Sequence, residues 1–133
     1  MTPRAALRPG LKARVEKVVP FEWTIAHFNP ELPPVLSTPA MIGMMEVAAA
    51  RAMQPALAPG AISVGTRIEV DHLKAVPAGA RVSASARLTR LNGRFVEFEM
   101  EARAGRHVIG RGKVFRAVVE PKKFHAKAKG RKK

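Results

Sequence analysis

The chain has 133 residues, 47% of them hydrophobic, and it contains no cysteine. This length suits a single domain with a substantial core, and the absence of cysteine excludes disulfides, a thiol nucleophile and thiolate-bound metals. The sequence shows neither the run of roughly 18 apolar residues that a membrane helix needs nor a leader with a cleavage site. We therefore expect a soluble, cytoplasmic protein that does not contact membranes.

The formal net charge of +14 is unevenly distributed. Residues 120–133, EPKKFHAKAKGRKK, hold seven of the 24 Lys and Arg residues and one of the ten acidic residues, a net charge of +6. A block of like charge without a periodic apolar face is usually disordered, so we expect a disordered basic tail. The +8 of the remaining chain suits a ligand with several phosphates as well as a nucleic acid, and charge alone does not separate the two.

The first predicted elements are a short extension, a strand and a loop. Residues 1–10 precede the first regular pattern. The sequence LKARVEKVV predicts a strand over residues 11–19, continued through residues 21–24 beyond Pro20. Residues 26–38, AHFNPELPPVLST, are rich in proline and predict a loop.

A long apolar helix, TPAMIGMMEVAAARAM, is predicted to run from Thr38 to about Met53. A threonine oxygen can cap the free N–H groups of a helix, and a following proline suits its first position. Glu46 is the one acidic residue in this run. Because burying an ionised carboxylate without a partner costs several kcal/mol, Glu46 needs either a partner, such as Arg51, or a partly exposed helix face.

Four strands alternating with turn signals follow the helix. They are predicted over residues 61–73, 81–91, 94–103 and 107–119. Asn92 and Gly93 predict a hairpin turn, because both residues tolerate positive φ. A helix that is apolar nearly all round must be enclosed, and one curved antiparallel sheet wrapped round it achieves this. The sequence therefore predicts an α+β fold with a long central helix.

Two polar side chains fall on strand faces that carry hydrophobic residues. His72 shares the even face of its strand with Val70, and Arg116 shares the even face of the last strand with Val114. An inward arginine needs a carboxylate, a phosphate or a wet cleft. Each residue alone also has a structural explanation: a strand-end histidine bonded to a backbone carbonyl, and a strand whose odd face is the core.

Thr38, Glu46 and His72 taken together are harder to explain as three coincidences. A threonine at a helix start, a carboxylate eight residues later and a histidine on the inward face of the next strand suit acid–base and nucleophilic chemistry. The sequence therefore predicts a catalytic constellation of these three residues.

Three segments carry a resemblance to a known family: residues 36–50 (LSTPAMIGMMEVAAA), 63–79 (SVGTRIEVDHLKAVPAG) and 109–119 (IGRGKVFRAVV). Over residues 11–119 the chain resembles the fluoroacetyl-CoA thioesterase-like branch of the hot-dog fold superfamily. The resemblance implies a hot-dog domain over residues 11–119. It also implies a homodimer or higher oligomer whose sheets join edge to edge, with active sites at the subunit interface.

The resemblance also implies roles for individual residues. Thr38, Glu46 and His72 match the catalytic threonine, glutamate and histidine of the family. Gly65 matches its glycine near the acyl group, and Arg116 matches its arginine on the last strand. The aromatic residue expected to line the acyl pocket is Phe28.

From these residues we expect an acyl-CoA thioesterase that hydrolyses a short or small acyl-CoA without a cofactor or metal. His72 is expected to be the general acid–base and Glu46 either to orient it or to activate water, while Thr38 is either the nucleophile or a positioning group. The alternatives are a non-catalytic acyl-CoA or acyl-carrier binding protein and a hot-dog hydratase. Nucleic-acid contact by the basic tail is a further alternative, and we do not expect it to be the main function.

Overall fold

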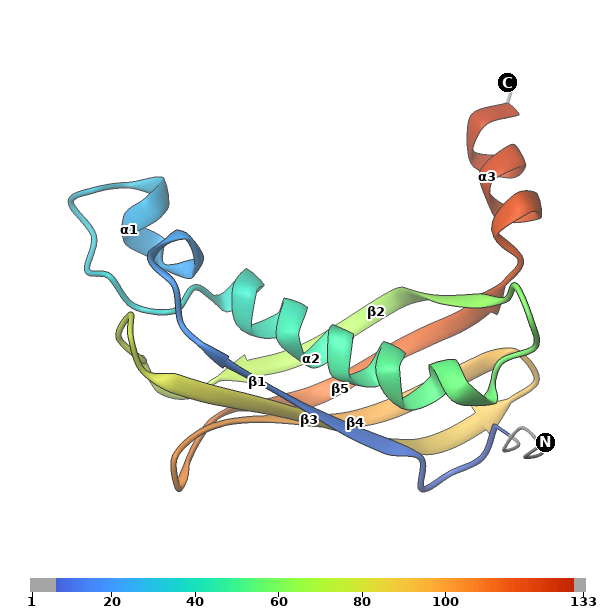
Figure 1. Ribbon diagram of the computed structural model, residues 1–133, viewed down its shortest axis with the longest axis horizontal. Helices are drawn as coiled ribbons and strands as arrows, with labels where there is room; N and C mark the ends of the chain where they lie inside the picture. The colour runs from blue at the N-terminus through green and yellow to red at the C-terminus, as the bar shows by residue number, and fades with distance from the viewer. Residues whose placement is uncertain (1–6, 131–133) are drawn as a thin grey trace.

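The structure is a computed structural model that describes residues 7–130, and it consists of one antiparallel sheet and a long helix (Figure 1). The α+β fold with a long central helix predicted from the sequence is confirmed. From the N-terminus, the elements are β1 (Lys12–Val18), the 3-10 helix η1 (Phe21–Trp23), α1 (Ile25–Phe28), α2 (Thr38–Met53), the 3-10 helix η2 (Gln54–Ala56), β2 (Ile62–His72), β3 (Arg81–Asn92), β4 (Phe95–Ala104), β5 (His107–Val119) and α3 (Pro121–Gly130).

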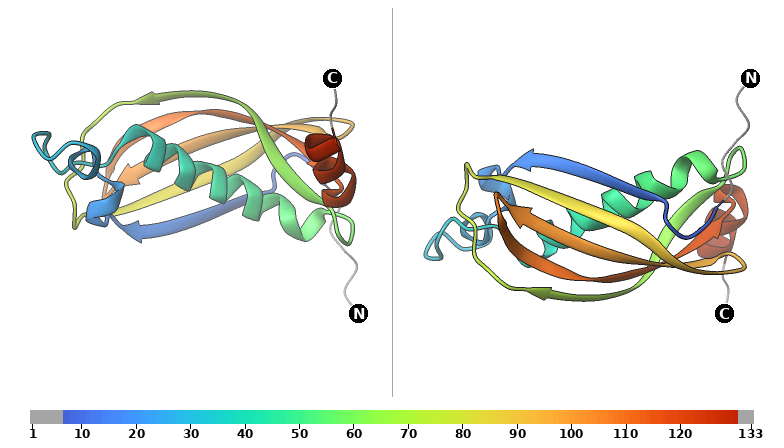
Figure 2. Two further views of the ribbon diagram at one scale, coloured as in Figure 1. Left: turned by 90° about the horizontal axis from the view of Figure 1, so that it is seen from above. Right: turned by 90° about the horizontal axis from the view of Figure 1, so that it is seen from below.

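The five strands lie in the order β1-β3-β4-β5-β2, and α2 lies across one face of this sheet (Figure 2). Beneath the helix, β3 and β4 present alternate residues that are buried, including the small Ala84 and Ala102 and the large Leu88 and Phe98. The alanines let the helix approach while the larger side chains fill the core. α2 packs mainly against β1 and β3, so its β2 side carries fewer contacts.

The prediction that the first strand continues beyond Pro20 is wrong. The chain instead turns into η1, in which the Trp23 N–H donates to the Pro20 carbonyl over 3.0 Å. The Thr24 hydroxyl donates to the carbonyl of Phe21 over 2.6 Å and closes the turn. These local bonds replace the ladder bonds that a strand would need, and Pro20 has no N–H to donate to a ladder.

The predicted helix span, residues 38–53, is confirmed, but its cap is Ser37 rather than Thr38. The Ser37 hydroxyl accepts a hydrogen bond from the Ala40 N–H over 3.2 Å. Because Ser37 fills the capping position, the hydroxyl of Thr38 is not used to start the helix.

A β-bulge at Thr66 changes the predicted register of β2. The pairing with β5 shifts between Gly65 and Arg67, so one residue is added on the β2 side. The even-numbered residues face α2 only after the bulge, as predicted for Val70 and His72. Before it, the odd-numbered Gly65 faces α2, because a single added residue reverses the alternation of side chains.

The basic tail was expected to be disordered, and the structure differs: α3 covers Pro121–Gly130. Alanine and lysine are good helix formers, and the N–H of Phe124 donates to the carbonyl of Glu120 over 2.9 Å at the start of the helix. No residue of α3 is buried. Residues 131–133 of the predicted tail, and residues 1–6 of the predicted extension, lie outside the described residues. Within the described chain, no helix is long and apolar enough to cross a membrane.

Candidate active site

The start of α2 and the end of β2 bring Thr38 and His72 into contact. The Oγ1 of Thr38 lies 2.7 Å from the Nδ1 of His72, a hydrogen bond whose direction follows the histidine tautomer. Thr38 is exposed, whereas the ring of His72 is half-buried. When Nδ1 carries no hydrogen, it accepts the proton of the Thr38 hydroxyl, which is the arrangement that activates a nucleophile.

Gly110 allows α2 to lie this close to the sheet. It pairs with His72 across β2 and β5, and a Cβ atom added to it would lie 2.5 Å from the sulfur of Met41 in α2. Glycine within a strand often marks such a close approach. The short distance between Thr38 and His72 therefore depends on a residue of a third element.

Two polar groups of this pair have no hydrogen-bond partner among the described residues. The Nε2 atom of His72 is buried without one. The N–H of Thr38 also has none, whereas Ala40 and Met41 donate to Ser37. A free N–H in the first turn of a helix attracts negative charge. The pair thus combines a base, a hydroxyl and an N–H group that can stabilise an oxyanion.

Glu46 lies in a second polar cluster, further along α2. Its Oε2 atom lies 3.7 Å from a terminal nitrogen of Arg116, and its side chain is 35% exposed. Arg116 is 7% exposed and donates from Nε to the Ser63 hydroxyl and from Nη2 to the Ser63 carbonyl, each over 3.0 Å. Desolvation lowers the pKa of Arg116, and the negative charge of Glu46 opposes this shift.

Gly65 completes this second cluster on β2. A Cβ atom added to Gly65 would collide with the carboxylate of Glu46, so the glycine is what leaves room for that side chain. The bulge is required for this arrangement, because without it Gly65 and His72 would face opposite sides of the sheet. The structure therefore brings together Glu46, Arg116 and Gly65, as it does Thr38 and His72.

The two clusters are separated within the described chain. Thr38 and Glu46 lie eight residues apart on one helix, which corresponds to about 12 Å of rise. No hydrogen bond or ion pair joins Glu46 to Thr38 or His72 in the part of the chain that the structure describes. Phe28 joins neither cluster: it is 74% exposed, and its ring lies 5.5 Å from that of His27.

Ser63 and Gly110 are the residues of these clusters that the sequence prediction missed. Strict alternation from Val70 and His72 would put the odd-numbered Ser63 on the outer face, whereas the bulge turns it toward α2. Gly110 could have been found from the sequence. It lies with Gly112 inside a predicted strand, and a glycine inside a strand often marks a point where another part of the chain comes close.

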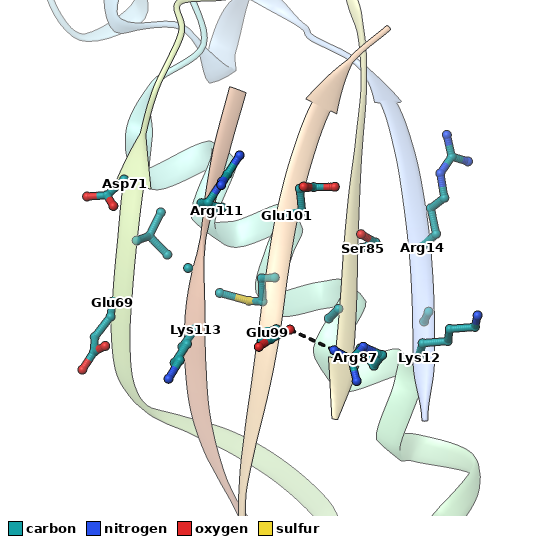
Figure 3. Close-up of a pocket in the computed structure, with 15 residues that line it drawn as sticks. Lys12, Arg14, Glu69, Asp71, Ser85, Arg87, Glu99, Glu101, Arg111 and Lys113 are labelled. Atoms are coloured by element: carbon teal, nitrogen blue, oxygen red, sulfur yellow. Dashed lines mark hydrogen bonds and ion pairs between the residues drawn. The ribbon is translucent and has the colours of Figure 1, made fainter. Parts of the chain in front are cut away.

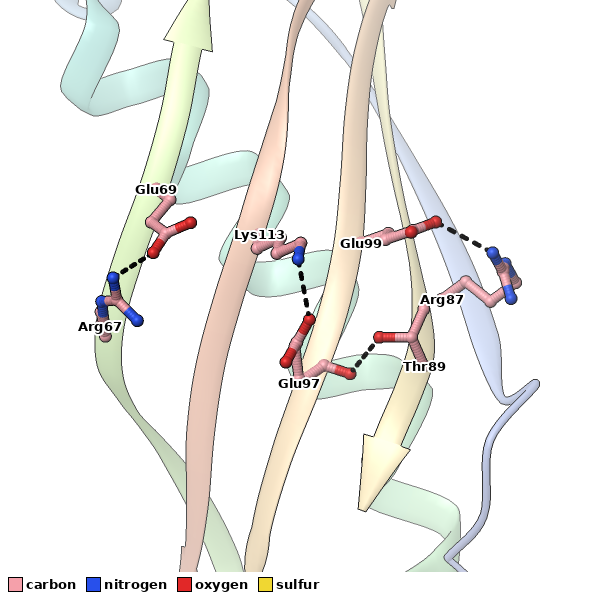
Figure 4. A network of polar contacts seen from close by, with 7 residues as sticks. All are labelled: Arg67, Glu69, Arg87, Thr89, Glu97, Glu99 and Lys113. Carbon is pink, nitrogen blue, oxygen red and sulfur yellow. Dashed lines mark hydrogen bonds and ion pairs between the residues drawn. The ribbon is translucent and has the colours of Figure 1, made fainter. Parts of the chain in front are cut away.

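The opposite face of the sheet has a different character. It carries a shallow depression of about 1090 Å³, lined by acidic side chains of β2 and β4 and by basic side chains of β1, β3 and β5 (Figure 3). Many of these charges are paired, as Figure 4 shows for Arg67 with Glu69, Arg87 with Glu99 and Lys113 with Glu97. Within residues 7–130, no group of three or more His, Asp or Glu residues is arranged to hold a metal ion.

A long helix wrapped by a five-stranded antiparallel sheet is the architecture of the hot-dog fold, which the family resemblance implied. A hot-dog-like protein from Thermanaerovibrio acidaminovorans superimposes with a TM-score of 0.83 at 25% identity, over 92% of this chain and 90% of that chain. A structure of the fluoroacetyl-CoA thioesterase superimposes with a TM-score of 0.89 at 37% identity, over 97% of this chain and all of that chain (100%).

The sequence comparisons identify the family. A family model described as fluoroacetyl-CoA-specific thioesterase matches residues 19–122. The chain is also 39% identical to the fluoroacetyl-CoA thioesterase of Streptantibioticus cattleyicolor over 129 residues, which cover 92% of this chain and 93% of that protein. The chain belongs to the fluoroacetyl-CoA-specific thioesterase family, a family of thioester hydrolases, and the predicted resemblance is confirmed.

Proposed function

We propose that the protein is an acyl-CoA thioesterase that hydrolyses a small acyl-CoA to the free acid and CoA. The observation that carries this proposal is the 2.7 Å contact between Thr38 and His72 at a helix start with a free N–H group. The family supports the same chemistry, and a solved mutant of the related fluoroacetyl-CoA thioesterase is a complex with fluoroacetate and CoA.

In the proposed mechanism, His72 accepts the proton of the Thr38 hydroxyl as Oγ1 attacks the thioester carbonyl carbon. The N–H of Thr38 stabilises the oxyanion that forms. The carbon–sulfur bond then breaks, and the departing CoA thiolate takes the proton from His72. Glu46 is the carboxylate that we assign to deacylation: it takes a proton from water as the water oxygen attacks the acyl-threonine carbonyl. The bond between the acyl carbon and Oγ1 then breaks, and that proton passes to Oγ1, which releases the free acid and restores Thr38 and Glu46.

Glu46 reaches the acyl group in this proposal because the active protein is a homodimer. β2 is the last strand of the sheet, so one of its edges has no neighbouring strand within the described chain. Two copies of β2 paired antiparallel about a two-fold axis place the His72 end of one strand beside the Gly65 end of the other. The partner's Glu46, which lies next to its own Gly65, then approaches Thr38 and His72.

Exposed hydrophobic side chains on α2 and at both ends of β2 support this dimer. Val47 is 44% exposed, Ile62 37% and Leu73 53%. Large hydrophobic side chains near an unpaired strand edge indicate a protein interface, and pairing also removes an edge that would promote aggregation. The complete active site in this proposal is thus made by two chains.

The acyl group accepted by the pocket is proposed to depend on the segment that begins at the last residue of α1 and leads to α2. Phe28 is the aromatic residue that we assign to the acyl pocket, and Leu32 follows it in the same exposed segment. We propose a small acyl group without assigning selectivity for a fluorinated one.

A panel of short acyl-CoAs with detection of the released thiol tests the function. Wild type should hydrolyse at least one of them, and Thr38→Ala, Glu46→Gln and His72→Ala should each lower kcat by roughly 100-fold or more, the usual range for lost acid–base or nucleophilic groups. Matched substitutions away from both clusters, Thr89→Ala, Glu22→Gln and His107→Ala, should retain activity.

The nucleophile is tested separately by mass spectrometry of the quenched enzyme. Acyl-threonine should accumulate at Thr38 in the Glu46→Gln variant, because deacylation is then slow. If wild type binds acyl-CoAs in calorimetry but releases no thiol, the protein is a binding module instead of an enzyme. Unchanged rates in all three variants would also contradict the proposal.

A further inference from the structure

The C-terminal helix α3 carries positive charge that the rest of the described chain does not neutralise. Its lysines are Lys122, Lys123, Lys127 and Lys129. Lys123 lies 3.7 Å from Glu120, and the other three have no ion pair with a described residue. On the outer face of the sheet, by contrast, arginines and lysines repeatedly face carboxylates, as Figure 4 shows. Uncompensated cations on one element favour an anionic ligand.

The helix is also unusual in having no residue in the core. A helix of ten residues is only marginally stable in water on its own, and tertiary contacts normally supply the remainder. The large apolar side chain of Phe124 also remains 45% exposed. An anion that binds several lysines would stabilise the helix and reduce the repulsion between them.

α3 lies at the end of the sheet that carries the cluster of Glu46, Gly65 and Arg116. α3 follows β5 and projects on the same side of the sheet as α2, at the end where β2 begins (Figures 1 and 2). Val119, two residues before it, pairs with Ile62. Pro121 lies five residues after Arg116, which corresponds to about 16 Å along an extended chain. The pantetheine arm of CoA, which joins the thioester to the nucleotide, has a comparable extended length.

We propose that α3 binds the phosphates of the CoA nucleotide through Lys122, Lys127 and Lys129. This inference rests on the proposed function, since it assumes that the acyl end of the substrate lies beside Gly65. In the proposed dimer, the α3 involved belongs to the chain that supplies Glu46 and Gly65. The helix then anchors the end of the substrate that does not react, and it contributes to binding without taking part in the chemical step.

The test compares two substrates that share an acyl group, an acyl-CoA and the corresponding acyl-pantetheine, which lacks the nucleotide. The variant is Lys122→Gln/Lys127→Gln/Lys129→Gln, because glutamine keeps the helix propensity of lysine. KM for the acyl-CoA should rise roughly tenfold with kcat within about twofold, as expected for three exposed ionic contacts. KM for acyl-pantetheine should not change.

A control variant removes the same charge elsewhere: Lys12→Gln/Arg106→Gln/Arg111→Gln changes exposed cations away from α3. It should leave KM for the acyl-CoA within about twofold of wild type. An unchanged KM in the α3 variant, an equal rise in the control, or an equal rise for acyl-pantetheine would overturn the inference while leaving the thioesterase function intact.

Calorimetry with CoA itself tests phosphate binding by α3 independently of thioester hydrolysis. If wild type hydrolyses neither substrate, the proposed function fails, but tighter binding of CoA than of pantetheine, lost in the α3 variant, still supports the role of α3. Equal binding of the two compounds overturns it. Tighter binding of a short single-stranded RNA than of CoA, lost in the same variant, would assign α3 to nucleic acid and contradict the inference.

Discussion

The contact between Thr38 and His72 depends on two neighbouring residues, Ser37 and Gly110. Ser37 caps α2, so the hydroxyl of Thr38 is available to His72. Gly110 removes the side chain that would keep α2 away from the sheet at this point. At the scale of single residues, the candidate site therefore depends on a serine and a glycine that have no chemical role themselves.

Replacing Gly110 by alanine tests this dependence. The new Cβ would lie 2.5 Å from the fully buried sulfur of Met41, so the start of α2 must move or the methionine must repack. We expect a loss of about 1–3 kcal/mol in the free energy of unfolding and a fall in kcat as the contact between Thr38 and His72 lengthens. Chemical denaturation and thiol-release kinetics measure the two effects.

Gly43→Ala is the matched control for that substitution. Gly43 lies inside α2, and nothing lies within 4 Å of a Cβ added there. The free energy of unfolding should rise by about 0.5–1 kcal/mol, because alanine favours a helix over glycine. If Gly110→Ala leaves both stability and kcat unchanged, the close approach of α2 to β5 is not what positions Thr38.

At the scale of elements, the bulge in β2 decides which residues face the helix. Deleting Thr66 removes the added residue, so the residues on one side of it must reverse their faces. We expect the deletion to separate Gly65 from His72, to abolish thiol release and to lower the melting temperature. Thr66→Ala keeps the residue count and loses only the bond from Thr66 to the Phe115 carbonyl, so it should cost about 1 kcal/mol and retain activity.

Sequence patterns predict the spans of the main elements but not the bulge in β2 or the cap of α2. The span of α2 and the four strands after it follow from apolar periodicity and turn residues, and the structure agrees with them closely. The bulge does not follow from periodicity, since alternation before Thr66 and after it is equally regular. The identity of the cap could not be derived either, because Ser37 and Thr38 are both good capping residues.

The polar residues illustrate the same limit. The sequence leaves two orientations open for Arg116, into the core or outward. The structure buries it beside Ser63 and Glu46. That Thr38 and His72 share a contact was expected from their types and spacing. The distance between them and Glu46 depends on how α2 crosses β2, which no local pattern encodes. The helical form of α3 was missed, because its composition suits both a helix and a disordered tail.

For the whole molecule, we propose that each active site uses two chains. In that proposal, one chain supplies Thr38 and His72, and its partner supplies Glu46 with Gly65 and Arg116. It is supported by the separation of the two clusters along α2 and by the edge of β2 that has no neighbouring strand among the described residues. It predicts that the protein is a dimer at the concentrations at which it hydrolyses acyl-CoA.

Purified heterodimers test this claim most directly. A dimer that joins a Thr38→Ala chain to a Glu46→Gln chain, isolated through two different affinity tags, retains one complete site in the two-chain arrangement and should show about half the activity of wild type. The control joins Thr38→Ala to His72→Ala, which leaves no complete site and should be inactive. An inactive Thr38→Ala and Glu46→Gln heterodimer would contradict the account, because it would place all three residues in a site made by one chain.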